Sequence, residues 1–509
     1  MLFNTVEYAI FFIVVVLINY ILPQKYRYIW LLVSSYYFYG NWDAKYTLLM
    51  FVITAVTYIC GVLIERCRER EEEPFQEQRD MKIILISCCV ICFGLLLYFK
   101  YTNFLIQNIN SVVYRLCNGK SFSMFDIILP VGISFYIFQA VGYVIDVYRG
   151  EVETEKNFFR YSLFVSFFPQ LVAGPIERSK NLLKQLRNPE VLDAEMLREG
   201  LILIGIGVWQ KVLIADNIAQ LINPVFAENA HYLGVTNIVA VILFGFQIYC
   251  DFGGYTNIAI GSAKILGVEL MNNFDAPYLA TSVTDFWSRW HISLTSWFRD
   301  YLYIPLGGNR KGKVRTYINT FIVFAVSGMW HGAAWNYIVW GIINGIMMIV
   351  SNLRKDIVLT RAKIEENNKK KYVNYSGKVD KLFKTVGTFA LVDLSWLFFR
   401  AESCKRAFEM MKETVNNFGI TSLAAYDIIP TLIGQELGDN KKLTVVIVGI
   451  VILMLIDAIK DKTGNFISYL SKQKAIYRWL FYFTIVLMTI AFGVYGREYE
   501  QVGFIYFQF

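Results

Sequence analysis

The 509-residue sequence predicts an all-α integral membrane protein that crosses the bilayer many times. Hydrophobic residues make up 56% of the chain and charged residues 18%, against roughly a quarter charged residues in a soluble protein. Apolar runs recur from Leu2 to Gly496, and a run of about 20 residues spans the hydrocarbon core. We therefore expect a single membrane-embedded domain over residues 1–509, not several soluble domains.

Several of the apolar segments are too short for a full crossing. Breaks at Pro130, Pro169 and Pro175 are typical of half-helices or re-entrant segments, which are tolerated where protein buries them. We expect about 11–13 membrane segments, some of them short or re-entrant. The candidate segments are 2–22, 29–41, 45–64, 83–100, 125–147, 158–173, 200–222, 236–255, 316–333, 335–351, 386–400, 443–458 and 479–496.

The Lys and Arg distribution predicts the orientation. The connections 66–82 and 460–478 carry five Lys or Arg each, and 352–384 carries ten with four acidic residues. The positive-inside rule places all three in the cytoplasm, together with Lys25 and Arg27, so both termini are expected outside. The amino terminus lacks the basic start and cleavage site of a signal peptide.

Several functional classes leave no trace in the sequence. The net charge of +8 is concentrated in 352–384, which is typical of a solvated loop near acidic headgroups, so we expect no nucleic-acid partner. The eight cysteines lie mostly in apolar runs, and the single C-x-x-C pair, Cys89 and Cys92, has no matching partner. A zinc site is therefore not indicated. Motifs for serine hydrolysis, nucleotide binding and zinc proteolysis are missing. We expect no metal.

His331 lies inside an apolar stretch, with Trp330 and Trp335 beside it. An ionisable residue at membrane depth indicates function, but a neutral imidazole hydrogen-bonded to a neighbouring helix is an equal alternative. Ser327 and Gly328 lie one turn earlier, where small residues leave room for a thin pantetheine-like chain or a sugar hydroxyl. A histidine here is suited to take a proton from a hydroxyl and to orient an acyl carbonyl.

The region 267–315 is aromatic, polar and basic, which predicts interfacial or buried helices. In a continuous helix His291 would share one face with Trp287, Trp290, Leu294 and Phe298. A plain aromatic packing stripe is the alternative to a functional role. The third histidine, His231, lies in a polar loop and is expected to be exposed.

Five motifs follow one another across roughly the middle third of the chain. They are FPQLVAGPIER (168–178), QIYCDFGGYT (247–256), DFWSRWHIS (285–293), WFRDYLYIPLGG (297–308) and MWHG (329–332). Together they resemble the membrane-bound O-acyltransferase (MBOAT) family. The similarity is to its bacterial branch of alginate and peptidoglycan O-acetyltransferases and teichoic-acid D-alanyl transfer proteins. It implies a helical bundle with a central tunnel, in which 158–351 is the motif-bearing core and 386–509 a C-terminal helical extension.

The resemblance implies that His331 is the catalytic histidine and His291 a second functional histidine, both lining the tunnel. A cytoplasmic thioester donor, expected to be acetyl-CoA, reaches them from one side and the acceptor from the other. No tightly bound cofactor is expected. Contacts to the donor are expected from Arg289, Arg299, Trp290 and Ser327. Structural ion pairing is the alternative for Arg289, Arg299, Asp251, Asp285 and Asp300, and the charges of Lys211 and Asp393 have no assigned role.

The chain ends in an aromatic tail, 503–509. It is similar to a C-terminal motif of related bacterial systems, in which a tyrosine is proposed to hold the acyl group transiently. This similarity implies that Tyr506 is an acyl relay. A phenol with a pKa of about 10 is a weak nucleophile without a base, and His331 would supply one. An interfacial aromatic anchor is the alternative.

These features lead us to expect a plasma-membrane acetyltransferase acting on an extracytoplasmic polysaccharide of the cell wall or an exopolysaccharide. Transfer occurs directly or through an extracytoplasmic SGNH-type acetyltransferase partner, as in related systems. The chain beyond Arg400 favours this activity over D-alanyl transfer to teichoic acid from a carrier protein. A lipid-linked sugar transporter with histidine proton relays is a further alternative, although no repeated halves are visible.

Overall fold

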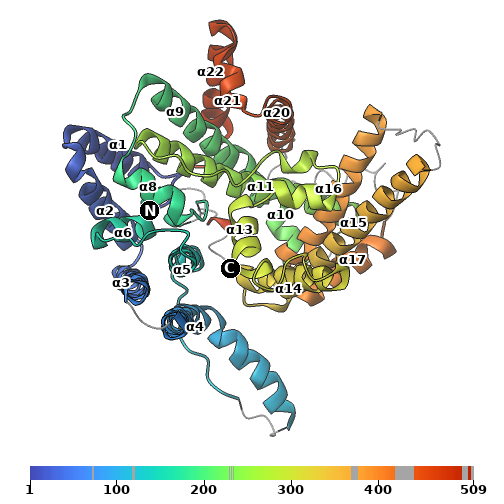
Figure 1. The fold of residues 1–509 in the computed structure, drawn as a ribbon. Coiled ribbons are helices and arrows are strands. Elements are labelled where there is room, and N and C mark those ends of the chain that lie inside the picture. Colours follow the sequence, from blue (N-terminus) through green and yellow to red (C-terminus); the bar gives the residue numbers. More distant parts are fainter. Residues whose placement is uncertain are drawn as a thin grey trace. The chain divides into compact units, whose positions relative to one another are not determined.

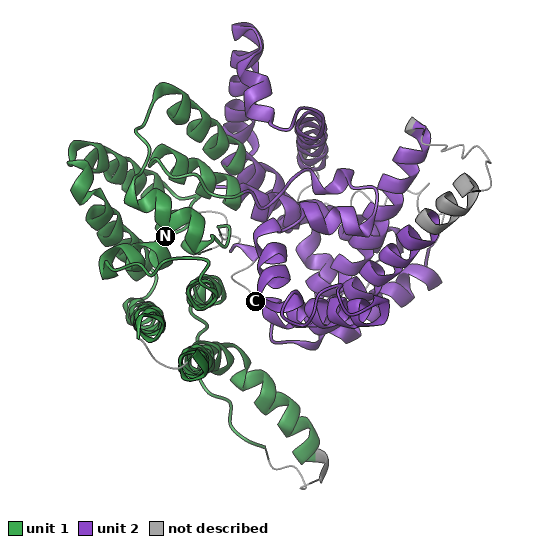
Figure 2. Ribbon diagram, in the orientation of Figure 1, with its two compact units in different colours: residues 1–207, 255–271 green, residues 208–254, 272–509 purple. Residues whose placement is uncertain are grey.

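The computed structural model describes residues 1–70, 74–116, 121–172, 174–228, 230, 232, 234–367, 377–418, 441–495 and 503–505. These residues form helices and connections (Figure 1). An isolated β-bridge joins Phe274 and Trp290. The all-α fold class is therefore confirmed. The chain divides into two compact units, residues 1–207 with 255–271 and residues 208–254 with 272–509 (Figure 2). The expectation of a single domain stays a prediction, and the unit boundaries fall inside the predicted 158–351 core.

Unit 1 is built from the N-terminal helices and the end of α11. Helix α3 packs against α4 and α5, and α2 packs against α1 and α6. Tyr8 on α1 shares a hydrogen bond of 2.8 Å with Ser262 on α11. The helices are α1 (Val6–Ile21), α2 (Gln24–Gly40), α3 (Ala44–Glu69), α4 (Pro74–Leu116), α5 (Ile133–Arg149), α6 (Phe158–Ser166), α7 (Phe168–Leu171), α8 (Ser179–Arg187), α9 (Ala194–Val208) and the end of α11 (Gly234–Ile265).

Unit 2 holds the start of α11 and the C-terminal half of the chain. Its most extensive helix contact joins α14 to α15, and α15 packs in turn against α16. Its elements after η1 (Trp209–Ala215), α10 (Asp216–Phe226) and α11 are η2 (Pro277–Leu279), α12 (Val283–Arg289), α13 (Ile292–Phe298), η3 (Arg299–Tyr303), α14 (Lys313–His331), α15 (Trp335–Asn367), α16 (Lys378–Arg400), α17 (Cys404–Asn416), α20 (Lys441–Thr463), α21 (Phe466–Ser471) and α22 (Ala475–Phe492).

Eight helices of the described chain are long and apolar enough to cross a membrane, and α1 is a shorter apolar helix. The other predicted segments form shorter or less apolar helices, and 158–173 breaks into α6 and α7 at Phe167. The eight are Ala44–Glu69, Pro74–Tyr114, Ala194–Phe226, Gly234–Ile265, Trp335–Val358, Val379–Arg400, Lys442–Thr463 and Ala475–Phe492.

The prediction that 352–384 is a loop is wrong for much of its length. Residues 352–367 continue α15, and 378–384 form the first turns of α16. Lys, Arg and Glu are good helix formers, and no Pro or Gly interrupts 352–367. The helix therefore continues beyond its apolar part.

Close packing of α14 on α15 depends on two glycines. A Cβ atom on Gly341 would lie 2.4 Å from the Phe324 carbonyl oxygen, and one on Gly328 would lie 2.4 Å from the Tyr337 carbonyl oxygen. Small residues allow this approach, which strengthens dispersion contacts between helices in a bilayer. The contact seats the C-terminal end of α14 against the first turns of α15.

We predict that Gly341→Ala destabilises the protein, because the added methyl group meets backbone atoms that cannot move independently. The expected cost is about 1–3 kcal/mol, typical of overpacking. Gly387→Ala on α16 is the matched control, because a Cβ there meets nothing within 4 Å. Thermal unfolding in a neutral detergent measures both variants. Equal melting temperatures for the two variants would contradict the packing argument.

Candidate active site

A cavity of about 300 Å³ in unit 2 contains both histidines selected from the sequence. Its walls come from α12, α13, η3, α14 and α15, which are separate in the chain by up to some sixty residues. The cavity brings together most of the predicted site. The predicted residues that line it are Trp290, His291, Arg299, Ser327 and His331.

His331 is the last residue of α14 and is 5% exposed. Its imidazole stands edge-on to three aromatic rings, with ring centroids at 5.0 Å for Trp330, 5.0 Å for Trp340 and 5.4 Å for Phe399. Edge-to-face rings at these distances pack favourably and restrict rotation of the imidazole. The aromatic walls therefore fix the position of the ring while one side of the residue lines the cavity.

His291 lies at a sharp break between α12 and α13, with φ 44° and ψ 52° in the left-handed region. Two strong contacts to Asn273 hold the chain beyond the break: its backbone carbonyl accepts from the Ile292 N–H (3.0 Å), and its side chain accepts from the Ser293 hydroxyl (2.6 Å). A non-glycine residue at positive φ is strained, and such strain clusters at functional sites. The predicted continuous helix through His291 is therefore wrong.

The break nevertheless leaves the predicted aromatic stripe on the cavity. Two tryptophans before the break and two apolar residues after it still reach the same space as His291, because the 273–275 segment folds the two short helices around it. The residues are Trp287, Trp290, Leu294 and Phe298.

The two imidazoles face a shared space. Their ring centroids are 6.4 Å apart, a separation that lets one small acyl group contact both. His291 is 2% exposed, and burial lowers its pKa to about 3, because a buried cation loses its hydration. His291 is therefore neutral at physiological pH, with one ring nitrogen able to donate and the other able to accept a hydrogen bond.

The small residues before His331 have different roles. Ser327 is 7% exposed and lines the cavity one turn before the histidine. The predicted space at Gly328 is instead filled by the backbone of α15, whose Gly341 lies against it. Room for an acyl chain therefore comes from Ser327 and the cavity.

The two arginines predicted to contact a donor differ in position. Arg299 lines the cavity and pairs with Asp300 at 2.8 Å, which raises the pKa of its guanidinium. Arg289 is not among the cavity-lining residues. Its guanidinium pairs with Asp285 and Asp461, each at 2.7 Å, and so ties α12 to α20.

A buried cluster of charges holds the C-terminal segment. The Lys211 ammonium pairs with Asp251 at 2.6 Å and with Asp216 at 2.8 Å, and all three side chains are at most 6% exposed. The other carboxylate oxygen of Asp251 accepts the Ile505 N–H at 2.7 Å. Phe504 lies 5.9 Å from Phe252 between ring centroids, and Phe252 lies 4.7 Å from His291. This cluster gives Lys211 and Asp251 a structural role.

Sequence patterns did not predict the aromatic residues of α15 and α16 that pack around His331. They also did not predict that Asn273 holds the chain next to His291. Trp340, Trp396 and Phe399 lie in ordinary apolar runs, and Asn273 lies in a loop. Trp340 stacks on Trp396 with ring centroids 5.6 Å apart. No local pattern marks these residues, because their role arises from contacts between distant segments.

Tyr506 and His231 lie outside the described residues.

The chain matches the model of the membrane-bound O-acyltransferase family over residues 31–392. It is 35% identical over 426 residues to a protein named probable alginate O-acetylase AlgI from Pseudomonas aeruginosa, covering 83% of this chain and 76% of that relative. It is 31% identical over 453 residues to a peptidoglycan O-acetyltransferase from Helicobacter pylori, covering 83% and 81%. A teichoic acid D-alanyltransferase from Streptococcus thermophilus matches over 53% of this chain and 68% of the relative, at 31% identity.

We predict that His291 makes the protein less stable as the pH falls. Its pKa of about 3 in the folded chain lies below the unfolded value of about 6.5, so the unfolded chain binds the extra proton. The stabilisation is complete above pH 6.5 and is lost as the pH decreases toward 3, by about 1.4 kcal/mol per pH unit. Asn accepts the left-handed conformation, so His291→Asn should melt with a shallower pH dependence between about pH 7 and 5.

Melting temperatures of purified protein across this range test the prediction. His231→Asn, in the polar sequence 228–232, is the control and should follow the wild type. Parallel curves for wild type and His291→Asn would show that His291 does not titrate on unfolding.

Proposed function

Because the chain belongs to the membrane-bound O-acyltransferase family, we propose that it transfers an acetyl group from cytoplasmic acetyl-CoA to an extracytoplasmic polysaccharide. The chain is an O-acyltransferase, and its apolar helices fit a multi-pass membrane protein. The observation that carries the proposal is the cavity that holds His291 and His331 together. The broad matches to proteins named as alginate and peptidoglycan O-acetylating enzymes support an acetyl donor and a polysaccharide acceptor.

His331 is the proposed general base. An attacking hydroxyl transfers its proton to the imidazole while its oxygen bonds to the thioester carbonyl carbon. The tetrahedral intermediate collapses, the C–S bond breaks, and the imidazolium returns the proton to the thiolate. Such proton transfer contributes about 10²–10⁴-fold to the rate. The rigid aromatic wall around His331 supports this role, because a base must hold its geometry.

His291 and Ser327 are proposed to position the acyl group. A neutral His291 donates one N–H to the carbonyl oxygen that becomes negative in the tetrahedral intermediate. Ser327 lines the same cavity, and its hydroxyl is proposed as a second hydrogen-bond donor beside the acyl group. Arg299, on the same wall, is proposed to attract the phosphates of the donor, and Trp290 to pack against it.

Tyr506 is the proposed relay between donor and acceptor. The residue before it, Ile505, is held by Asp251, and Phe504 contacts the ring that packs against His291. Ile505 directly precedes Tyr506 in the sequence, and its held position beside Asp251 supports the relay proposal. In the first step the phenol oxygen attacks the thioester, His331 takes the phenolic proton, and the thiol leaves with it. In the second step an acceptor hydroxyl takes the acetyl group and restores the phenol.

We also propose which side of the membrane the acceptor reacts on, from the orientation of the chain. The orientation expected from Lys and Arg places the tail outside, where an SGNH-type acetyltransferase partner would receive the acetyl group or the polysaccharide would react directly. D-alanyl transfer is the second candidate, but the relative with that name matches a smaller share of this chain than the O-acetylating relatives do. A transporter function is not supported, because the family is one of acyltransferases.

We predict that His331→Ala lowers acetyl transfer by at least about 100-fold, because the general base is lost. The measurements are the acetyl content of the cell's polysaccharide and thioester turnover by purified protein, with expression and membrane insertion checked. His231→Ala removes an imidazole from the polar sequence 228–232 and should leave both measurements unchanged. Normal polysaccharide acetylation in a well-expressed His331→Ala strain would refute the assignment.

We predict that Tyr506→Phe stops transfer to the acceptor but leaves donor binding intact, because only the relay hydroxyl is lost. Tyr495→Phe is the matched control, since its hydroxyl bonds the Ile490 carbonyl and has no part in transfer. Mass spectrometry of the trapped wild-type enzyme should detect an acetyl group on Tyr506. Full activity of Tyr506→Phe would exclude the relay while leaving the role of His331 standing.

A further inference from the structure

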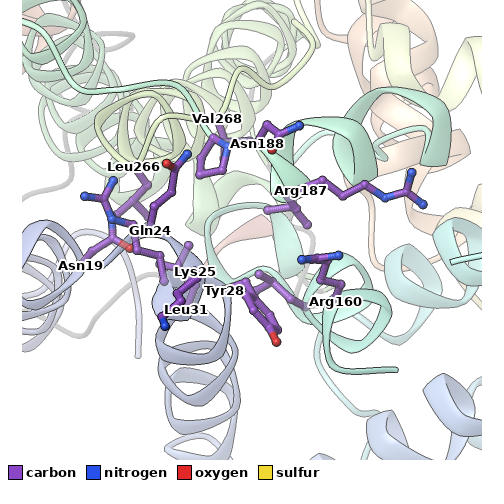
Figure 3. A pocket seen from close by; sticks show the side chains of 14 residues that line it. Asn19, Gln24, Lys25, Tyr28, Leu31, Arg160, Arg187, Asn188, Leu266 and Val268 are labelled. Carbon is purple, nitrogen blue, oxygen red and sulfur yellow. The ribbon is translucent and has the colours of Figure 1, made fainter. Parts of the chain in front are cut away.

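Unit 1 contains a second cavity, of about 280 Å³, whose lining is basic. It lies where α1, α2, α6, α8 and the loop after α11 meet, and Figure 3 shows the side chains around it. Four cations line it and no Asp or Glu does. They are Lys25, Arg27, Arg160 and Arg187.

Three of these cations have no carboxylate partner in the described chain. Arg27 donates from Nε to the Leu22 carbonyl at 3.2 Å and stacks over Tyr20, with its guanidinium carbon 5.0 Å from the ring centroid. The guanidinium carbon of Arg160 lies 5.1 Å from the Tyr28 ring centroid, and Lys25 lies over a tyrosine ring. Stacking on aromatic rings holds a cation in place without neutralising it.

Arg187 behaves differently. Its Nε donates to Glu155 at 2.7 Å, and Glu155 is 3% exposed. Figure 3 shows its guanidinium extending away from the other labelled side chains. Arg187 is therefore neutralised, and the positive charge of the cavity comes from the other three residues.

The start of α2 adds to this positive charge. Gln24 and Lys25, its first two residues, line the cavity, and Pro23 before them provides no side-chain cap. The first N–H groups of a helix lack partners within it and carry a partial positive charge, so they favour anions. Two arginines, a lysine and the N-terminus of a 17-residue helix thus surround one space.

A buried acceptor completes the cavity wall. Asn19 lines it and is 1% exposed, and its Oδ1 has no hydrogen-bond partner among the described residues. A buried polar atom costs free energy unless it is hydrogen-bonded. A hydroxyl on a bound molecule would satisfy it.

We propose that this cavity binds a phosphate group that carries a neighbouring hydroxyl. The phosphate would lie between Arg27, Arg160 and the first turn of α2, and the hydroxyl would donate to Asn19. Guanidinium groups suit phosphate because they offer paired N–H donors in one plane. The orientation expected from Lys and Arg places Lys25 and Arg27 on the cytoplasmic side, where anionic phospholipids and a coenzyme A donor both present such phosphates.

Binding to the full-length protein in a neutral detergent tests the proposal. The probes are dioctanoyl phosphatidylglycerol and coenzyme A, with dioctanoyl phosphatidylcholine as the zwitterionic comparison, titrated calorimetrically at about 100 mM salt. We expect one anionic probe to bind and its dissociation constant to rise at least about tenfold in Arg27→Gln/Arg160→Gln. Loss of phosphatidylglycerol binding identifies a lipid headgroup, and loss of coenzyme A binding identifies the donor phosphates.

Lys180→Gln is the matched control, because Lys180 is an exposed cation on α8 that does not line the cavity. It should keep wild-type affinity. The proposal is overturned if neither anionic probe binds, or if phosphatidylcholine binds with the same affinity as the anionic probe. It is also overturned if the double variant keeps wild-type affinity, or if Lys180→Gln loses as much affinity as the double variant. If the double variant does not fold, the dissociation constant of the single variant Arg160→Gln provides the test. Unchanged affinity in the double variant would overturn this site alone, because the readout does not depend on acyl transfer and the proposed function does not use Arg27 or Arg160.

Discussion

The close contact between α14 and α15 is the constraint on which the candidate active site depends. Burial by itself does not drive helices together in a bilayer, because lipid tails are as apolar as side chains. Gly328 and Gly341 instead let the two backbones approach until a methyl group no longer fits. The approach brings Trp340 of α15 to the edge of His331 at the end of α14. The position of the histidine follows from this helix pair, and Phe399 of α16 completes the aromatic rings around it.

A second constraint acts on the other side of the cavity. His291 occupies a left-handed conformation that an uninterrupted helix would not require, and the backbone and side chain of Asn273 hold the chain there. The backbone strain lies at His291 itself, whose ring is next to that of His331.

The buried charges of unit 2 cost desolvation free energy, and they also hold part of the C-terminal segment in place. Removing Lys211, Asp216 and Asp251 from water is expensive, and their mutual attraction only offsets that cost. Lys211 lies on η1, a π-helical segment of the kind often found at functional sites. The cluster leaves one oxygen of Asp251 for the backbone of Ile505. A short stretch of the tail is thereby held close to Phe252 and the histidine it contacts.

Composition along the chain already determined an all-α membrane protein, because apolar length is a local signal, and the ordered motifs carried the resemblance to its family. The two histidines stood out as ionisable residues near apolar or aromatic runs, and both line one cavity. The same local signals led to a continuous helix through His291 and a loop over 352–384. The structure has a break at His291 and helix over 352–367 and 378–384. Only the tertiary structure decided which residues form the walls. Trp340, Phe399 and Asn273 act through contacts across the fold. No pattern along a single segment records such contacts, since a side chain meets distant neighbours only after the backbone has folded.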